Sequence, residues 1–201
     1  MSTSPAADKK TATRDKILQA ALVCFAQKGY HQTSMDDIVA QSELSKGTLY
    51  WHFKSKQELF LALVEWFMLE FSQEVTHAWA EKMSAADKLR AMTKVSLDSA
   101  EQTIPFFKVF LDFWARTMED TKLRLIFSQI IEGFQNQLTE VIEAGIASGE
   151  FRPVNARALA LAMFAMLDAL LLYRTLLGDQ IDMYGSAETA IEVFLAGLRR
   201  Q

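Results

Sequence analysis

Apolar residues recur every three or four positions along most of this chain of 201 residues, which is the spacing of amphipathic helices. The segment from residue 13 to residue 28 is typical, because Ile17, Ala20, Ala21, Cys24 and Phe25 all fall on one helical face. The same spacing predicts longer helices over residues 55–81, 84–103, 105–118, 121–148, 155–177 and 187–200. The alternating pattern of a strand is not visible in the sequence, which therefore predicts an all-α fold of about nine helices.

Two short helices are predicted before the long segment that starts at residue 55. Thr33 or Ser34 can cap the first of them, which ends near Ser42, and Ser45 can cap the second. Two short helices joined by a tight turn have the spacing of a helix-turn-helix. With the helix over residues 13–28, they predict a module of three helices near the N-terminus.

The second short helix lies in SKGTLYWHFKSK, residues 45–56, and carries an unusual set of side chains. If Leu49 and Phe53 face inward, cationic, hydroxyl and aromatic groups occupy the outer and lateral faces. These groups belong to Lys46, Thr48, Tyr50, Trp51 and His52. They can hydrogen-bond phosphates, contact thymine methyl groups and pack along the wall of the major groove. Gly47 lets the helix N-terminus, which favours anions, come close to a duplex. We therefore interpret this helix as a DNA-reading element.

The charge distribution agrees with this interpretation, although the whole chain has a net charge of −4. Residues 1–57 hold eight basic and five acidic side chains, a net charge of +3. The remaining residues hold 13 basic and 20 acidic side chains, a net charge of −7. A basic module joined to an acidic one is typical of chains with a nucleic-acid partner. Alone, a charge of +3 would also fit a solvated surface.

These segments resemble the DNA-binding domain of the TetR family of bacterial transcriptional regulators. The matching pieces are FAQKGY at the end of the first helix, TSMDDI at the start of the second, and SKGTLYWHFKSKQEL. The resemblance implies three parts: a flexible N-terminal arm (1–12), a helix-turn-helix DNA-binding domain (13–57), and a ligand-binding and dimerisation domain (58–201).

The resemblance also implies which residues contact an operator in double-stranded DNA. The implied contacts are Thr33, Ser45, Lys46, Gly47, Thr48, Tyr50, Trp51, His52 and Lys56. Lys46, Gly47 and Trp51 are expected nearest the base edges. Thr33, Thr48, Tyr50, His52 and Lys56 are expected mainly on phosphates.

One residue departs from the family pattern. Members usually place glycine in the turn between the two short helices, where this chain has Glu43. If that turn requires a positive φ, a residue other than glycine costs roughly 1 kcal/mol there. We expect the turn to form nonetheless.

The last two predicted helices are candidates for a homodimer surface. Ala190, Ile191, Phe194, Leu195 and Leu198 form an apolar stripe, and the preceding helix, which includes Leu167 and Leu171, is apolar nearly all round. An intramolecular core would explain the same pattern. The resemblance favours a dimer, as does function, because a palindromic operator mirrors a two-fold axis.

Aromatic residues in the middle of the chain are candidates for a small-molecule effector site. They are Trp66, Phe67, Phe71, Phe106, Phe110, Phe113, Trp114 and Phe127. Ligand sites are apolar pockets with a few polar groups, although any single one of these residues is more often part of a core. Asp168 lies in the apolar segment MFAMLDALLL and is costly there unless it is partnered. It could contact a ligand, pair with Arg174 or another helix, or lie at the dimer seam.

The resemblance suggests how an effector would act. The long helix from Ser55 joins the DNA module to the larger domain. An effector that tilts this helix would change the separation of two recognition helices, which must match half-sites about 34–36 Å apart. We therefore expect a dimeric repressor that leaves its operator when a small apolar or aromatic effector binds.

Other classes of protein fit less well. His31, His52 and His77 lack metal-ligand spacing, and the sequence has no G-x-S-x-G, P-loop or C-x-x-C, so we expect no enzyme, metal or cofactor. The single Cys24 suits a reducing cytoplasm. The apolar segment 158–177 contains Asp168 and Arg174, so no membrane span is predicted. A helical scaffold or membrane-surface protein is the alternative, but it leaves residues 45–56 unexplained.

Overall fold

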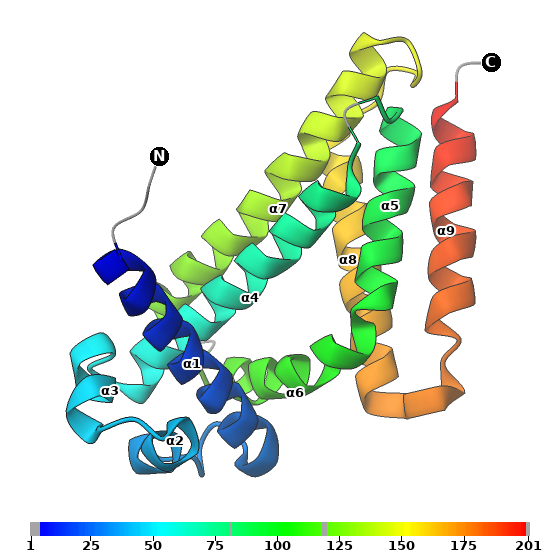
Figure 1. Ribbon diagram of the computed structural model, residues 1–201. Coiled ribbons are helices and arrows are strands. Elements are labelled where there is room, and N and C mark those ends of the chain that lie inside the picture. Colours follow the sequence, from blue (N-terminus) through cyan, green and yellow to red (C-terminus); the bar gives the residue numbers. More distant parts are fainter. Residues whose placement is uncertain (1–4, 81, 118–119, 200–201) are drawn as a thin grey trace. The chain divides into compact units, whose positions relative to one another are not determined.

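The computed structural model describes residues 5–80, 82–117 and 120–199, without the side chains of residues 5–9, 101, 114–117 and 122–123 (Figure 1). These ranges form α1 (Pro5–Lys28), α2 (Met35–Ser42), α3 (Lys46–His52), α4 (Lys56–Ala78), α5 (Ala85–Asp98), α6 (Ala100–Thr117), α7 (Thr121–Ala147), α8 (Ala156–Leu177), the short 3-10 helix η1 (Gly178–Gln180) and α9 (Met183–Leu198). Within them no strand occurs, only an isolated bridge between Phe151 and Arg199. The predicted all-α fold of about nine helices is confirmed.

Three predicted helix starts were wrong. α1 begins at Pro5 rather than near residue 13, and proline is well tolerated at a first helical position. Residues 5–12 of the expected arm are therefore helical, whereas residues 1–4 lie outside the described residues. α6 begins at Ala100, which places Pro105 inside the helix instead of in its first turn. α9 begins at Met183, because the Asp182 side chain accepts a backbone N–H in the first turn and caps the helix.

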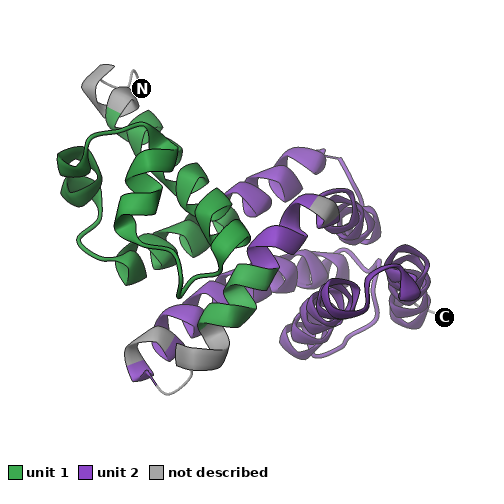
Figure 2. Cartoon of the chain, turned by 90° about the horizontal axis from the view of Figure 1, so that it is seen from below, with its two compact units in different colours: residues 1–69, 108–118 green, residues 70–107, 119–201 purple. Residues whose placement is uncertain are grey.

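The chain divides into two compact units (Figure 2). The first unit comprises residues 1–69 and 108–118, and the second comprises residues 70–107 and 119–201. Both α4 and α6 therefore contribute residues to each unit. The functional boundary expected between residues 57 and 58 stays a prediction.

The core of the first unit contains an aromatic cluster at the turn after α1. Phe25, Phe60 and Phe113 are completely buried. The Tyr30 ring lies between them, with centroid distances of 5.4, 5.3 and 4.8 Å, respectively. The end of α6 thus packs against the α1–α2 turn within this unit.

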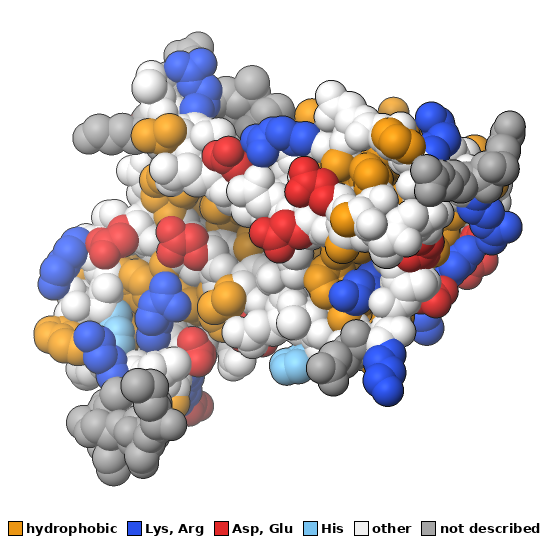
Figure 3. Space-filling view, turned by 90° about the horizontal axis from the view of Figure 1, so that it is seen from above, with side chains coloured by type: hydrophobic (Ala, Val, Ile, Leu, Met, Phe, Trp, Pro, Cys, Tyr) orange, Lys and Arg blue, Asp and Glu red, His pale blue; other side chains and the backbone are white. Residues whose placement is uncertain are grey.

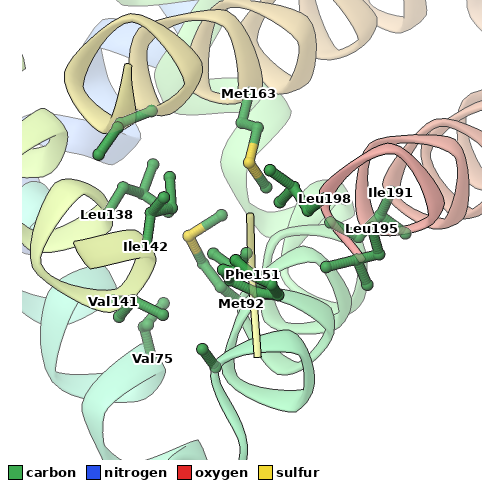
Figure 4. Packing of buried hydrophobic residues seen from close by; sticks show 14 residues of the cluster. Val75, Met92, Leu138, Val141, Ile142, Phe151, Met163, Ile191, Leu195 and Leu198 are labelled. Carbon is green, nitrogen blue, oxygen red and sulfur yellow. The ribbon is translucent and has the colours of Figure 1, made fainter. Parts of the chain in front are cut away.

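The second unit is built around α5, α7, α8 and α9, and Figure 4 shows its buried residues. Met92 of α5, Ile142 of α7, Met163 of α8 and Leu195 of α9 share this core. The assignment of Ile191, Leu195 and Leu198 to a dimer interface was wrong, because all three are buried inside the subunit. Leu167 and Phe194 are half-buried against the same core.

Candidate DNA-binding surface

Side-chain caps define where the two short helices of the first unit begin. The Ser34 hydroxyl accepts the Asp37 N–H at 3.1 Å, and the Asp37 carboxylate accepts the Ser34 N–H at 2.8 Å. This reciprocal pair is a capping box. At α3, the Ser45 hydroxyl accepts the Thr48 N–H at 3.0 Å and lies 2.8 Å from the Thr48 hydroxyl. Ser45 and Thr48 therefore define the start of α3. Their hydroxyl groups also lie on the exposed side of this helix.

The two faces of α3 differ as the sequence predicts. Leu49 is completely buried and Phe53 is 3% exposed, so they hold the helix on the unit. Trp51 is 60% exposed and Tyr50 is also exposed, although large aromatic side chains normally avoid water. Gly47 is exposed, and a Cβ there would meet nothing closer than the Ser45 hydroxyl at 3.7 Å. Packing within the subunit does not require glycine at this position.

His52 lies at the end of α3 and is half-buried. Its ring meets the Trp51 ring edge to face, with centroids 4.7 Å apart. Burial, together with the positive charges of Lys10 and Arg14, lowers the pKa of His52 below its usual value. This shift disfavours the cationic form of His52, whose ring nitrogens remain available as hydrogen-bonding groups.

Two residues expected on phosphates are engaged inside the subunit. Thr33 is 2% exposed, and its hydroxyl donates to the carbonyls of Gly29 and Cys24 at 2.8 and 3.1 Å. The expected phosphate contact through this side chain was wrong. The Lys56 ammonium donates to the carbonyls of Tyr30, His31 and Thr33 at 2.7, 3.1 and 2.8 Å.

These three bonds use all the donors that a lysine possesses. The ammonium also lies 4.6 Å from the centroid of the Tyr30 ring, and burial lowers the pKa of Lys56. Sequence spacing placed Lys56 near the duplex, but the carbonyls of the α1–α2 turn bind its ammonium instead. Its role in this structure is to hold that turn.

Lys46, expected at the base edges, forms an ion pair with Asp36 of α2. The ammonium nitrogen lies 2.7 Å from the carboxylate oxygen, and both side chains are more than half exposed. The hydrogen bond that Lys46 donates to the Asp36 carboxylate raises the pKa of Lys46. Basic and acidic side chains are also interspersed on the face of the molecule that Figure 3 shows, and hydrophobic side chains are exposed between them.

Replacing Asp36 by asparagine is expected to tighten DNA binding about two- to fivefold at low salt, because an exposed pair contributes up to about 1 kcal/mol. The change frees Lys46 for DNA and removes a negative charge beside the duplex. Fluorescence anisotropy with a labelled duplex measures the effect. Asp98→Asn is the matched control, since Lys94 and Asp98 form an exposed 2.7 Å pair in the second unit. Equal effects of both substitutions would exclude a local role for Asp36.

Glu43 occupies the turn between α2 and α3 with a left-handed backbone, φ 55° and ψ 25°. The positive φ expected from the family pattern is thus present with a non-glycine residue. Its carboxylate lies 3.8 Å from the Lys16 ammonium, and both side chains are exposed, so the pair adds little stability.

Glu43→Gly is expected to raise the free energy of unfolding by about 1 kcal/mol, because glycine adopts a left-handed backbone without strain. The melting temperature should rise by about 2–4 °C in a chain of this size. Circular dichroism measures the transition. Glu43→Ala is the control, since it removes the Lys16 pair but keeps the Cβ. An equal rise for alanine would show that charge, and not the backbone, is responsible.

The residues expected to bind an effector are divided between the two units. The first unit holds Trp66, Phe67, Phe110 and Phe113, and the second holds Phe71, Phe106, Phe127 and Asp168. Phe106, Phe113 and Phe127 are buried, and the Trp114 side chain lies outside the described residues. Phe113 belongs to the aromatic cluster of the first unit, which fits a residue of the hydrophobic core rather than one that binds an effector.

In the second unit, Phe71 begins a row of half-buried rings. Phe71 of α4 lies 5.6 Å from Phe134 of α7, and Phe134 stacks on Phe164 of α8, also at 5.6 Å. Phe134 and Phe164 were not among the effector-binding residues expected from the sequence. Their helical spacing carried no signal that distinguished them from other apolar residues on the same helices.

Asp168 lies at an exposed position of α8. Arg174, one of the partners considered for Asp168, forms an ion pair with Asp179. The apolar side chains around Asp168 partly desolvate its carboxyl group, which raises the pKa of Asp168 to about 6. The folded chain therefore binds this proton more tightly than the unfolded chain between about pH 4 and pH 6. The contribution of Asp168 to stability falls as the pH rises through this window.

Asp168→Asn is accordingly expected to raise the melting temperature at pH 7.5 and to leave it nearly unchanged at pH 4, where the native carboxyl is already protonated. Thermal melts of both proteins across this range measure the difference. Glu188→Gln, at an exposed position of α9, controls for the loss of one negative charge. A difference that does not vary with pH would contradict the raised pKa.

The exposed apolar residues of α8 and its neighbours were not identified from the sequence. Leu161, Tyr173, Leu176, Leu177, Tyr184 and Val193 are between 43% and 66% exposed. Leu171, one of the expected dimer residues, is half-buried. The segment Ala156–Gln180 is long and apolar enough to cross a membrane, by length and composition only, and most of it is not buried within the described residues.

Comparisons with known proteins agree with the fold. Residues 17–63 match the family described as bacterial regulatory proteins, tetR family, and residues 85–200 match the BetI-type transcriptional repressor, C-terminal. The chain is 28% identical over 199 residues to the HTH-type transcriptional regulator YfiR of Bacillus subtilis, covering 94% of each.

Solved structures show the same fold. The regulator FadR from Bacillus subtilis, in complex with stearoyl-CoA, has a TM-score of 0.69 at 22% identity, covering 92% of this chain and 98% of that one. A transcriptional regulator from Saccharomonospora viridis, in complex with choline, has a TM-score of 0.78 at 20% identity, covering 95% and 100%. These relatives are regulators rather than enzymes. The family match over residues 85–200 spans more than half of the chain, which therefore belongs to the TetR family of bacterial transcriptional regulators.

Proposed function

We propose that this ligand-responsive regulator is a cytoplasmic, dimeric repressor that binds a palindromic operator through α3. The observation that carries the proposal is the outer face of α3, where Trp51 is 60% exposed above a buried Leu49. Lys46, Thr48, Tyr50 and His52 supply donors and aromatic edges that can read bases or hold phosphates. Ser45, Gly47 and Thr48 bring the start of the helix to the duplex.

Dimerisation would occur through the exposed apolar residues of α8 and α9. Leu161 and Leu176 lie on one side of α8, and Val193 lies on the outer face of α9. A second copy that covers this surface by two-fold symmetry would remove it from water, which explains why apolar residues are kept there. Leu171 of α8 is half-buried in the single subunit and would lie at the edge of this interface.

The effector would be a small apolar or aromatic molecule bound in the second unit. The row formed by Phe71, Phe134 and Phe164 supports this site, because stacked rings bind apolar chains and planar molecules. Such rings also attract quaternary ammonium groups. The Phe71 ring comes from α4, which runs from Lys56, directly after the DNA-reading helix, to Ala78.

An effector that prefers a second position of α4 would change the separation of the two recognition helices in the dimer. The loss of operator affinity then equals the difference in the effector's binding free energy between the DNA-binding position of α4 and the second position. This coupling free energy is typically 1–3 kcal/mol, or about 5- to 150-fold in affinity. Repression relieved by a ligand is the result.

The test titrates the operator-bound protein with three probes: stearoyl-CoA, choline and a planar aromatic cation. Release of the labelled operator by one of them, with a loss of that response in Phe71→Ala and Phe164→Ala, supports the proposal. Leu125→Ala, at a 59% exposed residue of α7, is the control. Release that is unaffected by either phenylalanine substitution would place the effector elsewhere.

The apolar α8 also motivates the alternative of a membrane-surface protein. Flotation of the purified chain with liposomes separates the two functions. Floating protein that binds no duplex would favour the membrane, whereas a dimer that stays at the bottom of the gradient and binds DNA would favour the repressor.

A further inference from the structure

Two cations from the early turns of α1 lie directly beside the DNA-reading helix. The Lys10 ammonium is 5.0 Å from the centroid of the Trp51 ring, and the Arg14 guanidinium carbon is 5.8 Å from the centroid of the Phe53 ring. Lys10 and Arg14 are four residues apart, so they lie on one face of α1. Lys10 is exposed and Arg14 is half-buried.

The same two cations act on His52, which lies between Trp51 and Phe53. After burial, Lys10 and Arg14 are the causes of the lowered pKa of His52. Lys54, whose ammonium donates to the Tyr50 carbonyl at 2.8 Å, adds a third positive charge at this end of α3. Positive charge therefore gathers where α1 meets the end of α3, whereas Lys46 at the other end of α3 is paired with Asp36.

We infer that the early turns of α1 are a second DNA-contacting element, in which Lys10 and Arg14 hold phosphates that flank the bases read by α3. This inference rests on the proposed function. Trp51 is the most exposed aromatic side chain of α3, so any duplex that it touches lies within a few ångströms of Lys10. A duplex carries a phosphate charge for about every 1.7 Å of its axis, so anions are available at that distance.

The helical state of residues 5–12 makes these contacts different from those of a flexible arm. A flexible segment loses conformational freedom when it binds, whereas a formed helix has already been ordered by folding. Arg14 can keep its face on the Phe53 ring while an edge of its planar guanidinium donates to a phosphate. The Lys10 ammonium can move from the exposed Trp51 ring to a phosphate more readily than Arg14 can leave Phe53, because it is a compact charge on a flexible side chain.

The test measures operator affinity of the full chain against salt concentration for Lys10→Ala/Arg14→Ala. Each lost phosphate contact lowers the slope of log K against log[salt] by about 0.9. We therefore expect the slope to fall by about 1.8 per subunit, or about 3.6 per dimer, so the loss of affinity should be about 150-fold larger at 50 mM salt than at 200 mM. The sequence preference should persist, because Lys46 and Trp51 are intact.

Lys88→Ala/Lys94→Ala is the matched control, since it removes two positive charges from α5 in the second unit. Lys88 also lies over a tryptophan ring, 5.7 Å from the centroid of Trp79. Lys10→Arg/Arg14→Lys keeps both charges and should retain the wild-type slope. Thermal melts establish that each variant is folded.

A second comparison uses duplexes that end at the operator half-sites or extend beyond them by about five base pairs. The wild type should gain affinity from the extension, and the double alanine variant should not. If the wild type binds the operator and the alanine variant keeps the slope of the control, α1 does not touch DNA and this inference is wrong. A wild type that binds no duplex would instead overturn the proposed function as well.

Discussion

Phe113→Ala is expected to lower the free energy of unfolding by about 3–5 kcal/mol, the usual range for removing a buried phenylalanine ring. The Phe113 ring is completely buried, and its centroid lies 4.0 Å from that of Phe60 and 4.8 Å from that of Tyr30. Alanine would leave a cavity lined by these rings. The backbone N–H of Tyr30 donates to the Asp112 carboxylate at 3.2 Å, so the substitution also loosens the neighbouring contact of α6.

Urea denaturation followed by circular dichroism measures this loss. Phe113→Leu keeps most of the volume and should cost less than half as much, and Leu125→Ala at an exposed position should cost almost nothing. A loss below about 1 kcal/mol for Phe113→Ala would mean that the ring is not part of the core. Such a small loss would favour the role in effector binding that the sequence suggested for Phe113.

Lys56→Ala is the second large expected effect, a loss of about 2–4 kcal/mol in the free energy of unfolding. The substitution removes three hydrogen bonds from a charged donor and leaves the carbonyls of Tyr30, His31 and Thr33 without that donor. Hydrogen bonds to charged groups contribute about 1.5–3 kcal/mol each when buried, and this site is partly open to water, so the sum is smaller. Denaturation of the free protein measures the loss.

Lys54→Ala is the control, because its exposed ammonium makes a single hydrogen bond to the Tyr50 carbonyl. For DNA binding the control is Lys94→Ala in the second unit, because Lys54 belongs to the positive charge beside α3. If Lys56 contacts a phosphate, as the family resemblance implies, its removal lowers the salt slope of operator binding by about 0.9 per subunit. Unchanged stability together with that lower slope would contradict the structural role.

The DNA-reading module was predictable because its signals are local. Ser34 and Ser45 lie three residues before the N–H groups that they cap, so sequence spacing alone identifies the two helix starts. Leu49 and Phe53 are four apart, which fixes the inward face of α3 and hence the exposure of Trp51. The backbone of Glu43 follows from the family pattern of a glycine at that turn.

The roles that depend on distant contacts were not predictable. Periodicity identifies the apolar face of α9 but not the element that covers it, so Ile191, Leu195 and Leu198 fitted a dimer as well as a core. Phe113 meets Tyr30, which lies 83 residues earlier, and Lys56 meets carbonyls more than 20 residues earlier. A helical pattern contains no information about such partners.

The most direct test of the central claim is the selection of duplexes from a randomised pool by the purified protein at moderate salt. Lys46→Ala/Trp51→Ala is selected in parallel. The wild type is expected to enrich a palindrome with half-sites about one helical turn apart, and the double variant is not. Failure of the wild type to enrich any sequence, or enrichment of the same palindrome by both proteins, would contradict a DNA-reading role for the outer face of α3.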